Sequence, residues 1–238
     1  MAQPTQSFVR NCLLSAVDAA GYAAIAPHLE PVDLPRGAVL IEADLPFSHV
    51  HFLNSGIGSI AVSTADGRQV EAGLFGYEGL SGFACLLGVD QCAQATFMQV
   101  EGEGYRVPTD ALRSACRQSE SLRETILRYV YVFMSQTSYT TLSYANQAIE
   151  GRLARWLLMC HDRVTGNDIA LTHEFLSIML AVRRPSVTTA LNMIEGYGFI
   201  RARRGHITIL NRDALVDFAD GTYGKPEAEY RRLIGPFG

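Results

Sequence analysis

The sequence predicts an α+β protein made of an N-terminal antiparallel β-roll, a long helix and a C-terminal helical part with a small hairpin. Three observations support this fold class. Short β-type runs separated by turn residues fill residues 32–107, apolar residues at helical spacing extend over 119–145, and two short helical patterns precede two β-type runs between 171 and 210. We therefore expect three parts, comprising residues 1–118, 119–145 and 146–238.

The composition is that of an ordinary globular protein. Of the 238 residues 48% are hydrophobic and 18% are charged, which argues against a disordered or fibrous chain. The sequence shows neither an apolar run long enough to span a membrane nor a secretory signal, so we expect a cytoplasmic protein with no membrane partner. Its cysteines lack paired spacing, which favours reduced, mostly buried thiols over a redox sensor: Cys12, Cys85, Cys92, Cys116 and Cys160.

The first part is expected to hold one helix followed by strands. Apolar residues at helical spacing before Pro27 predict a helix over 7–26. The runs that follow are short, evenly spaced and free of intervening helices, and this pattern favours an antiparallel roll or jelly roll. The clearest strands are 34–41, 50–53, 59–63, 69–75 and 96–100, with turns at Gly56, Asp66-Gly67 and Gly102.

A long helix is expected next. After a short helix over 109–116, the pattern of 119–145 predicts a helix of roughly 40 Å at 1.5 Å per residue. Four apolar residues along it alternate at spacings of four and three, as in a two-stranded coiled coil, and we expect them to form a dimer interface: Leu122, Ile126, Tyr129 and Phe133. The alternative is that this stripe packs only on its own domain. A further helix is predicted over 147–164.

Residues 171–198 have the pattern of a helix-turn-helix. Thr172 is a natural N-cap for a short amphipathic helix. Pro185 is tolerated only in the first turn of a helix and so fixes a second helix start near Arg184. Gly198 ends this helix, and the β-type runs after it are joined through an Arg-Arg-Gly turn that resembles a basic wing.

The charge distribution also points to a polyanion. The chain as a whole has a net charge of −4, but residues 151–212 hold nine arginines against four acidic residues. Guanidinium groups suit bidentate contacts with phosphates and guanine. We therefore expect double-stranded DNA to contact the first helix start, the exposed N-terminal part of the second helix and the wing: Thr172, His173, Arg183, Arg184, Ser186, Thr188, Thr189, Arg203, Arg204 and His206.

These residues and their order resemble the Crp/Fnr family of bacterial transcription regulators over roughly residues 30–212. The similar segments are 34–37 and 53–56 in the roll turns, 151–158 in the helix after the long helix, and 171–176 and 186–191 in the helix-turn-helix. The resemblance implies a roll of the cyclic-nucleotide-binding type, a homodimer on a pseudo-palindromic operator, and RNA polymerase as a further partner. It also implies a regulator and not an enzyme.

Two departures from the family pattern bear on specificity and signal. In catabolite-activator-like members the second helix presents an Arg-Glu pair and another Arg; here Arg184 keeps the first, while Pro185 and Thr189 replace the others. In the sensor, Gly76-Tyr77-Glu78 resembles the first half of the cyclic-nucleotide cassette, but Gln94-Ala95 stands where its Arg-Ser pair is expected. A buried phosphate without that arginine would lack a counter-charge.

The sequence therefore does not identify the effector. The candidate pocket residues by resemblance are Glu78, Gly79, Leu80, Ser81, Thr137 and Ser138. A cyclic nucleotide is disfavoured, and no iron-sulfur cluster is expected because Cys12 stands without neighbouring cysteines. His49 and His51 share a strand face but have no third ligand, so we expect no metal site. The alternative to a DNA-binding regulator is a small-ligand module that acts on a partner protein.

Overall fold

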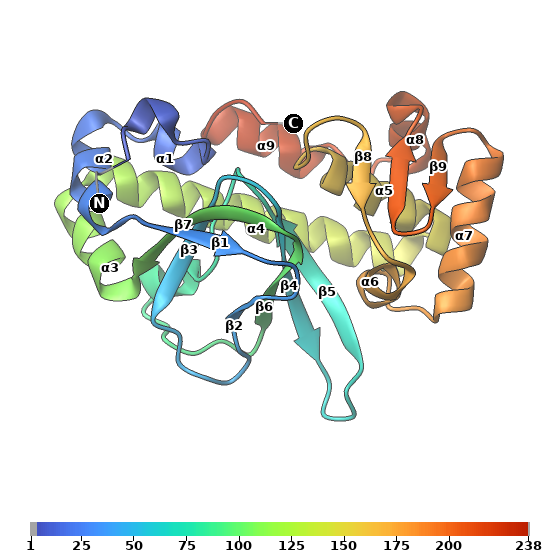
Figure 1. Ribbon diagram of the computed structural model, residues 1–238, viewed down its shortest axis with the longest axis horizontal. Coiled ribbons are helices and arrows are strands. Elements are labelled where there is room, and N and C mark those ends of the chain that lie inside the picture. Colours follow the sequence, from blue (N-terminus) through green and yellow to red (C-terminus); the bar gives the residue numbers. More distant parts are fainter. Residues whose placement is uncertain (1–3, 238) are drawn as a thin grey trace.

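The computed structural model describes residues 4–237 and confirms the predicted fold class. Antiparallel sheets occupy the N-terminal half, a long helix runs along the length of the molecule, and a helical domain with a small sheet follows it (Figure 1). In the described part of the chain, no helix combines the length and apolar character needed to cross a membrane.

The N-terminal segment is a series of short helices, so the prediction of one helix over 7–26 is wrong. The structure has η1 (Gln6–Phe8), α1 (Cys12–Ala16), α2 (Ala19–Ile25) and η2 (Ala26–His28). The side chain of Asn11 accepts from the backbone N–H groups of Leu13 and Leu14, and that of Asp18 accepts from Gly21. These two N-caps therefore start two separate helices, with extended backbone at Val17 between them.

The roll consists of two antiparallel sheets. One has the order β1 (Glu30–Leu34), β7 (Gly102–Pro108), β3 (His49–Leu53), and the other β2 (Val39–Ile41), β6 (Ala95–Val100), β4 (Ile57–Ser63), β5 (Gln69–Phe75). A turn at Pro35–Gly37 divides the predicted strand 34–41, and β7 was not predicted. Gly56 has a φ of 82°, and a Cβ there would lie 2.7 Å from the carbonyl oxygen of Val100, so this turn requires glycine.

Helix α4 (Glu120–Asn146) follows α3 (Thr109–Gln118) and packs on the roll. The four residues predicted as a dimer seam are all buried within their own protomer: Leu122, Ile126, Tyr129 and Phe133. They belong to the same core as the roll strands and the N-terminal helices. The dimer-seam prediction is therefore corrected, because this stripe is covered by the roll and is unavailable to a second chain.

The C-terminal domain begins with α5 (Ile149–His161). It continues through β8 (Asp168–Ala170), α6 (His173–Met179), α7 (Arg184–Gly196), β9 (Ile200–Arg203), β10 (His206–Ile209), α8 (Arg212–Phe218) and α9 (Lys225–Leu233). The strands form an antiparallel sheet in the order β8-β10-β9. Helix α7 and the hairpin fall where the sequence pattern predicted them, whereas β8, α8 and α9 were not predicted.

Packing ties the two halves together. The core of the C-terminal domain includes Ile57 and Leu74 of the roll. Helix α9 returns along α4, so that Tyr230 and Phe237 join the core of the roll (Figure 1). The end of the predicted third part, residues 146–238, thus packs on the first part.

Candidate nucleic-acid interface

The helix-turn-helix is built from α6, a turn and α7. Thr172 caps α6, because its Oγ1 accepts a hydrogen bond of 3.3 Å from the backbone N–H of Phe175. The turn passes through Ala181, which has a φ of 52°, and Pro185 lies in the first turn of α7. The inner face of α7 is fully buried: Val187, Ala190, Leu191 and Ile194. The opposite face of α7 is therefore left to solvent.

That outer face carries the residues predicted to contact DNA. His173, Arg183, Arg184, Thr188 and Thr189 are exposed, and Thr172 and Ser186 are half-buried. Arg184 pairs with Glu174 of α6 at 2.8 Å between Nη2 and Oε1, and this ion pair is open to water. The Thr188 hydroxyl lies 3.2 Å from Nδ1 of His173. The structure thus brings both helices' candidate residues onto one surface.

The wing is the β9–β10 hairpin. It exposes Arg203, Arg204 and His206 around Gly205, whose φ of 80° suits a tight turn. His206 Nδ1 lies 2.8 Å from Asp168 of β8. The hydrogen bonds from His206 and Thr208 lower the pKa of Asp168, so β8 anchors the base of the wing. Its two arginine side chains have no such partner carboxylate among the ion pairs of residues 4–237.

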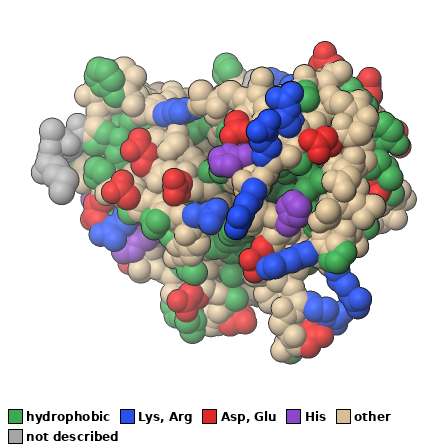
Figure 2. Space-filling model, turned by 45° about the vertical axis from the view of Figure 1, so that its right-hand side comes forward, with side chains coloured by type: hydrophobic (Ala, Val, Ile, Leu, Met, Phe, Trp, Pro, Cys, Tyr) green, Lys and Arg blue, Asp and Glu red, His purple; other side chains and the backbone are tan. Residues whose placement is uncertain are grey.

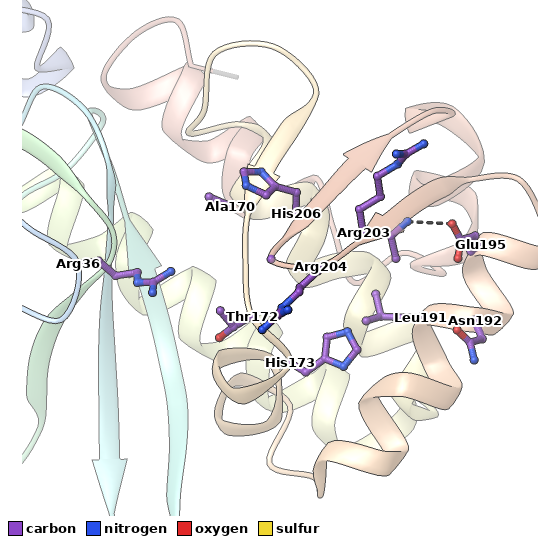
Figure 3. A pocket seen from close by; sticks show the side chains of 12 residues that line it. Arg36, Ala170, Thr172, His173, Leu191, Asn192, Glu195, Arg203, Arg204 and His206 are labelled. Carbon is purple, nitrogen blue, oxygen red and sulfur yellow. Dashed lines mark hydrogen bonds between the residues drawn. The ribbon is translucent and has the colours of Figure 1, made fainter.

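A cleft of about 810 Å³ separates this domain from the roll. Figure 3 shows Arg36, from the turn between β1 and β2, reaching across it toward Arg204 and His173. The Arg36 guanidinium lies 5.9 Å from the ring centre of Phe175. Figure 2 shows arginine and histidine side chains gathered in the middle of this face. The cleft is therefore basic on both sides.

Three residues of the cleft were missed by the sequence analysis. Asn192 is exposed on α7 four residues after Thr188, and this spacing could have identified it. Glu195 accepts a hydrogen bond of 2.9 Å from the backbone N–H of Ala202 and so ties α7 to the wing. Arg36 carries no local signal, because only the fold brings the roll next to α6.

The candidate effector residues fall into two separate places. Glu78 is buried and pairs with Arg163, at 2.7 Å between Oε1 and Nη2. Leu80 and Ser81 are buried as well, and the Ser81 hydroxyl accepts from the backbone N–H of His51. A Cβ at Gly79 would lie 2.4 Å from the Tyr129 hydroxyl. This loop is packed and does not line a ligand-sized cavity.

Thr137 and Ser138, in contrast, line a cavity of about 660 Å³ between the roll and α4. Gln94 lines it too, whereas Glu78 does not. The pocket predicted from the resemblance is therefore corrected. Its two α4 residues and Gln94 face the cavity, and its loop residues from Glu78 to Ser81 do not.

The histidines and cysteines show no assembled site in residues 4–237. No group of three or more His, Cys, Asp or Glu there could hold a metal ion. Burial lowers the pKa of His51 to about 4, and its ring Nδ1 lies 3.1 Å from the Ser81 hydroxyl. All five cysteines are unpaired, and burial raises the pKa of Cys12 to about 11.

Comparison with known proteins points to one family. Residues 151–218 match the family model of the Crp-like helix-turn-helix domain. A CRP-like cAMP-activated global transcriptional regulator of Mycobacterium tuberculosis is 22% identical to the chain, over 87% of this chain and 96% of its own length. The chain is therefore similar to Crp/Fnr regulators over most of its length, and the family model itself covers its helix-turn-helix domain. The similarity is to DNA-binding transcription regulators and not to enzymes.

Solved structures agree with the Crp/Fnr fold. FixK2 of Bradyrhizobium japonicum has a TM-score of 0.70 at 15% identity, covering 80% of this chain and 96% of that one. A Crp/Fnr-family transcription regulator of Thermus thermophilus has a TM-score of 0.66 at 17% identity, covering 81% of this chain and all of its own. At these identities the likeness supports the fold alone.

Proposed function

We propose that this protein is a Crp/Fnr-type regulator that binds a pseudo-palindromic operator as a homodimer, with two copies of α7 in successive major grooves about 34 Å apart. The observation that carries the proposal is the exposed start of α7. It presents two guanidiniums and two short hydroxyls beside a basic wing: Arg183, Arg184, Thr188 and Thr189, next to Arg203 and Arg204. The side chains on α7 suit base edges, whereas those on the wing suit backbone phosphates. DNA binding in this mode implies a place in the cytoplasm, with RNA polymerase as a further partner.

A different face of α4 supports dimerisation. Its exposed or half-buried apolar and small residues recur at spacings of four and three: Leu127, Tyr131, Met134, Ser138, Thr141 and Ala145. Tyr131 is 51% and Met134 63% exposed, which is high for apolar side chains in the middle of a long helix. Such a repeat is the seam of a two-stranded coiled coil. We assign the dimer interface to this row in place of the buried one.

We also propose that the roll does not hold a cyclic nucleotide in the usual way. The ion pair with Arg163 engages Glu78, and a neutral amide, Gln94, stands at the cavity where the family cassette has an arginine. The rival function, a ligand module that docks a partner protein, is less well supported. A docking surface does not require the concentrated positive charge of α7 and the wing.

The test is an operator selected from random duplexes with the wild-type protein, followed by binding titrations. Substitution of Arg183 and Arg184 by Ala should weaken operator binding by about 1–3 kcal/mol for each bidentate base contact that it removes, with little change on unrelated DNA. Arg203→Ala or Arg204→Ala should weaken binding to all sequences and reduce the salt slope by about one. A duplex with one half-site should bind far more weakly than the full operator.

Two outcomes would overturn this proposal. Unchanged operator affinity of the Arg183/Arg184 variant would refute the base-contact role, and wild-type affinity for a single half-site equal to that for the full operator would refute the homodimer. Arg68→Ala, an exposed arginine on the far turn between β4 and β5, is the matched control. It removes one positive charge from the roll, as each single substitution on the wing does from the wing, and should leave operator affinity unchanged.

A further inference from the structure

The cavity beside α4 is a three-walled space with a definite chemistry. The four-stranded sheet forms one wall through Ile41, Ile60 and Thr96, and α4 forms another through Phe133 and Thr137. Its volume of about 660 Å³ lies in the range of small-molecule sites, roughly 300–1,000 Å³. The cavity is therefore large enough to hold an aromatic molecule of two or three rings.

The walls carry no formal charge. Among the described residues that line the cavity, none is Asp, Glu, Lys, Arg or His. The polar side chains among these residues are two amides, three hydroxyls and the Cys92 thiol, whose pKa is raised by burial. Two of the hydroxyls are already engaged: Thr137 donates to the carbonyl of Phe133 and Ser138 to that of Met134. An anionic ligand would lose its hydration here without gaining a counter-charge. An uncharged ligand would pay no such cost.

A short loop forms the third wall. It is η3 (Phe83–Leu87), which is bounded by Gly82 and Gly88, both with left-handed φ of 70° and 81°. Phe83 contacts the ring of Phe133 at 5.3 Å between centres, so the loop and α4 meet through aromatic rings. A flat apolar ligand would extend this aromatic packing.

We propose that this cavity binds an uncharged, mainly aromatic or apolar small molecule as the effector of the regulator. The ligand's role as an effector rests on the proposed function. The site touches the row of α4 assigned to the dimer interface, because Met134 and Ser138 belong to both. A bound ligand would therefore contact the same side chains as the partner helix.

Two probes with one skeleton test the chemical class. N-phenyl-1-naphthylamine is neutral, and 8-anilino-1-naphthalenesulfonate is the same molecule with a sulfonate. In fluorescence titrations of the full chain, we expect the neutral probe to bind at least about tenfold more tightly. Equal or tighter binding of the sulfonate would overturn the proposal.

Substitutions in the cavity and on its rim test whether the probe binds there. Ala72→Phe fills it and should weaken binding of the neutral probe about tenfold, whereas Ala65→Phe, on the exposed turn between β4 and β5, should not. Gln94→Arg adds a guanidinium at an exposed position of the rim and should tighten the sulfonate about tenfold, whereas Gln94→Met should not.

The site would be refuted if Ala72→Phe left the affinity for the neutral probe unchanged and Gln94→Arg did not raise the affinity for the sulfonate. The probe would then bind elsewhere on the protein. Operator titrations on the same samples keep the two proposals separate. If the wild-type protein binds its operator but not the neutral probe, this inference alone fails. If it binds the neutral probe but no operator, the proposed function alone fails.

Discussion

Two arginine–carboxylate pairs of this protein have nearly the same geometry and opposite surroundings. Arg163 lies 2.7 Å from Glu78 with side chains 2% and 3% exposed, and Arg184 lies 2.8 Å from Glu174 with side chains 61% and 67% exposed. The first joins the roll to the C-terminal domain, and the second lies within the helix-turn-helix. The comparison teaches that the surroundings, and not the contact itself, decide whether an arginine holds the fold or remains available to DNA.

The buried pair is fully satisfied. Arg163 donates from Nε and Nη2 to Glu78 and from Nη1 to the carbonyl of Met159, while the other Glu78 oxygen accepts from the N–H of Gly76. Burial alone would lower the pKa of Arg163, but the charges of Glu78 and Asp162 outweigh it and leave the pKa raised. The ionised form of Arg163 thus depends on these carboxylates.

The largest expected effect is the loss of this pair. Glu78→Gln leaves a buried guanidinium without its counter-charge and should reduce the free energy of unfolding by about 3–5 kcal/mol. Urea denaturation followed by circular dichroism measures this change in the free energy of unfolding. The double substitution of Glu78 by Leu and Arg163 by Met replaces the pair with apolar side chains and should restore much of the stability. A cost below about 1 kcal/mol for Glu78→Gln would show that water reaches Arg163.

A buried carboxylate without an arginine in contact sharpens the comparison. Glu71 of β5 is buried against α5, where it accepts hydrogen bonds from Ser59 at 2.8 Å and from the indole of Trp156 at 2.9 Å. These neutral donors stabilise the ionised form less than a guanidinium does. Burial consequently raises the pKa of Glu71 from 4.5 to about 7.

The second prediction follows from the sign of this shift. Between pH 4.5 and 7 the folded protein binds a proton at Glu71 that the unfolded chain has released. The contribution of Glu71 to the free energy of unfolding therefore falls as the pH rises through that window and is constant above it. The fall should be about 3 kcal/mol. Glu71→Gln should remove it, so that the stability difference between variant and wild type moves in favour of the variant from pH 5 to pH 8 in urea titrations. A constant difference across this range would mean that Glu71 is ionised throughout.

These contrasts also explain what the sequence could and could not predict. Helix α7 was predicted well, because Pro185 fixes its start and its apolar spacing fixes its inner face. The outer face, and with it the candidate DNA-contacting residues, follows from the same spacing. Local signals of this kind suffice where a helix is exposed on one side.

The dimer seam failed for a physical reason. Periodicity shows which side chains of α4 are apolar but not what covers them, and α4 has two such rows. The roll covers the row with Leu122, while the row with Met134 stays exposed. Likewise, Glu78 and Arg163 are 85 residues apart, and no local pattern links them. The buried charge pair and the cavity arise only from long-range packing.

The smallest expected effect on stability belongs to the exposed pair. Glu174→Gln should change the free energy of unfolding by no more than about 0.5 kcal/mol, because both charges of the pair are already hydrated. The same substitution should strengthen DNA binding. Removing the carboxylate frees Arg184 and lowers the repulsion between this surface and the phosphates. Operator affinity should therefore rise a few-fold at low salt and less at high salt. Gel-shift titrations at two salt concentrations measure this. A fall in affinity would instead assign Glu174 the task of orienting Arg184 toward a base, and the exposed pair would then be as necessary to function as the buried pair is to the fold.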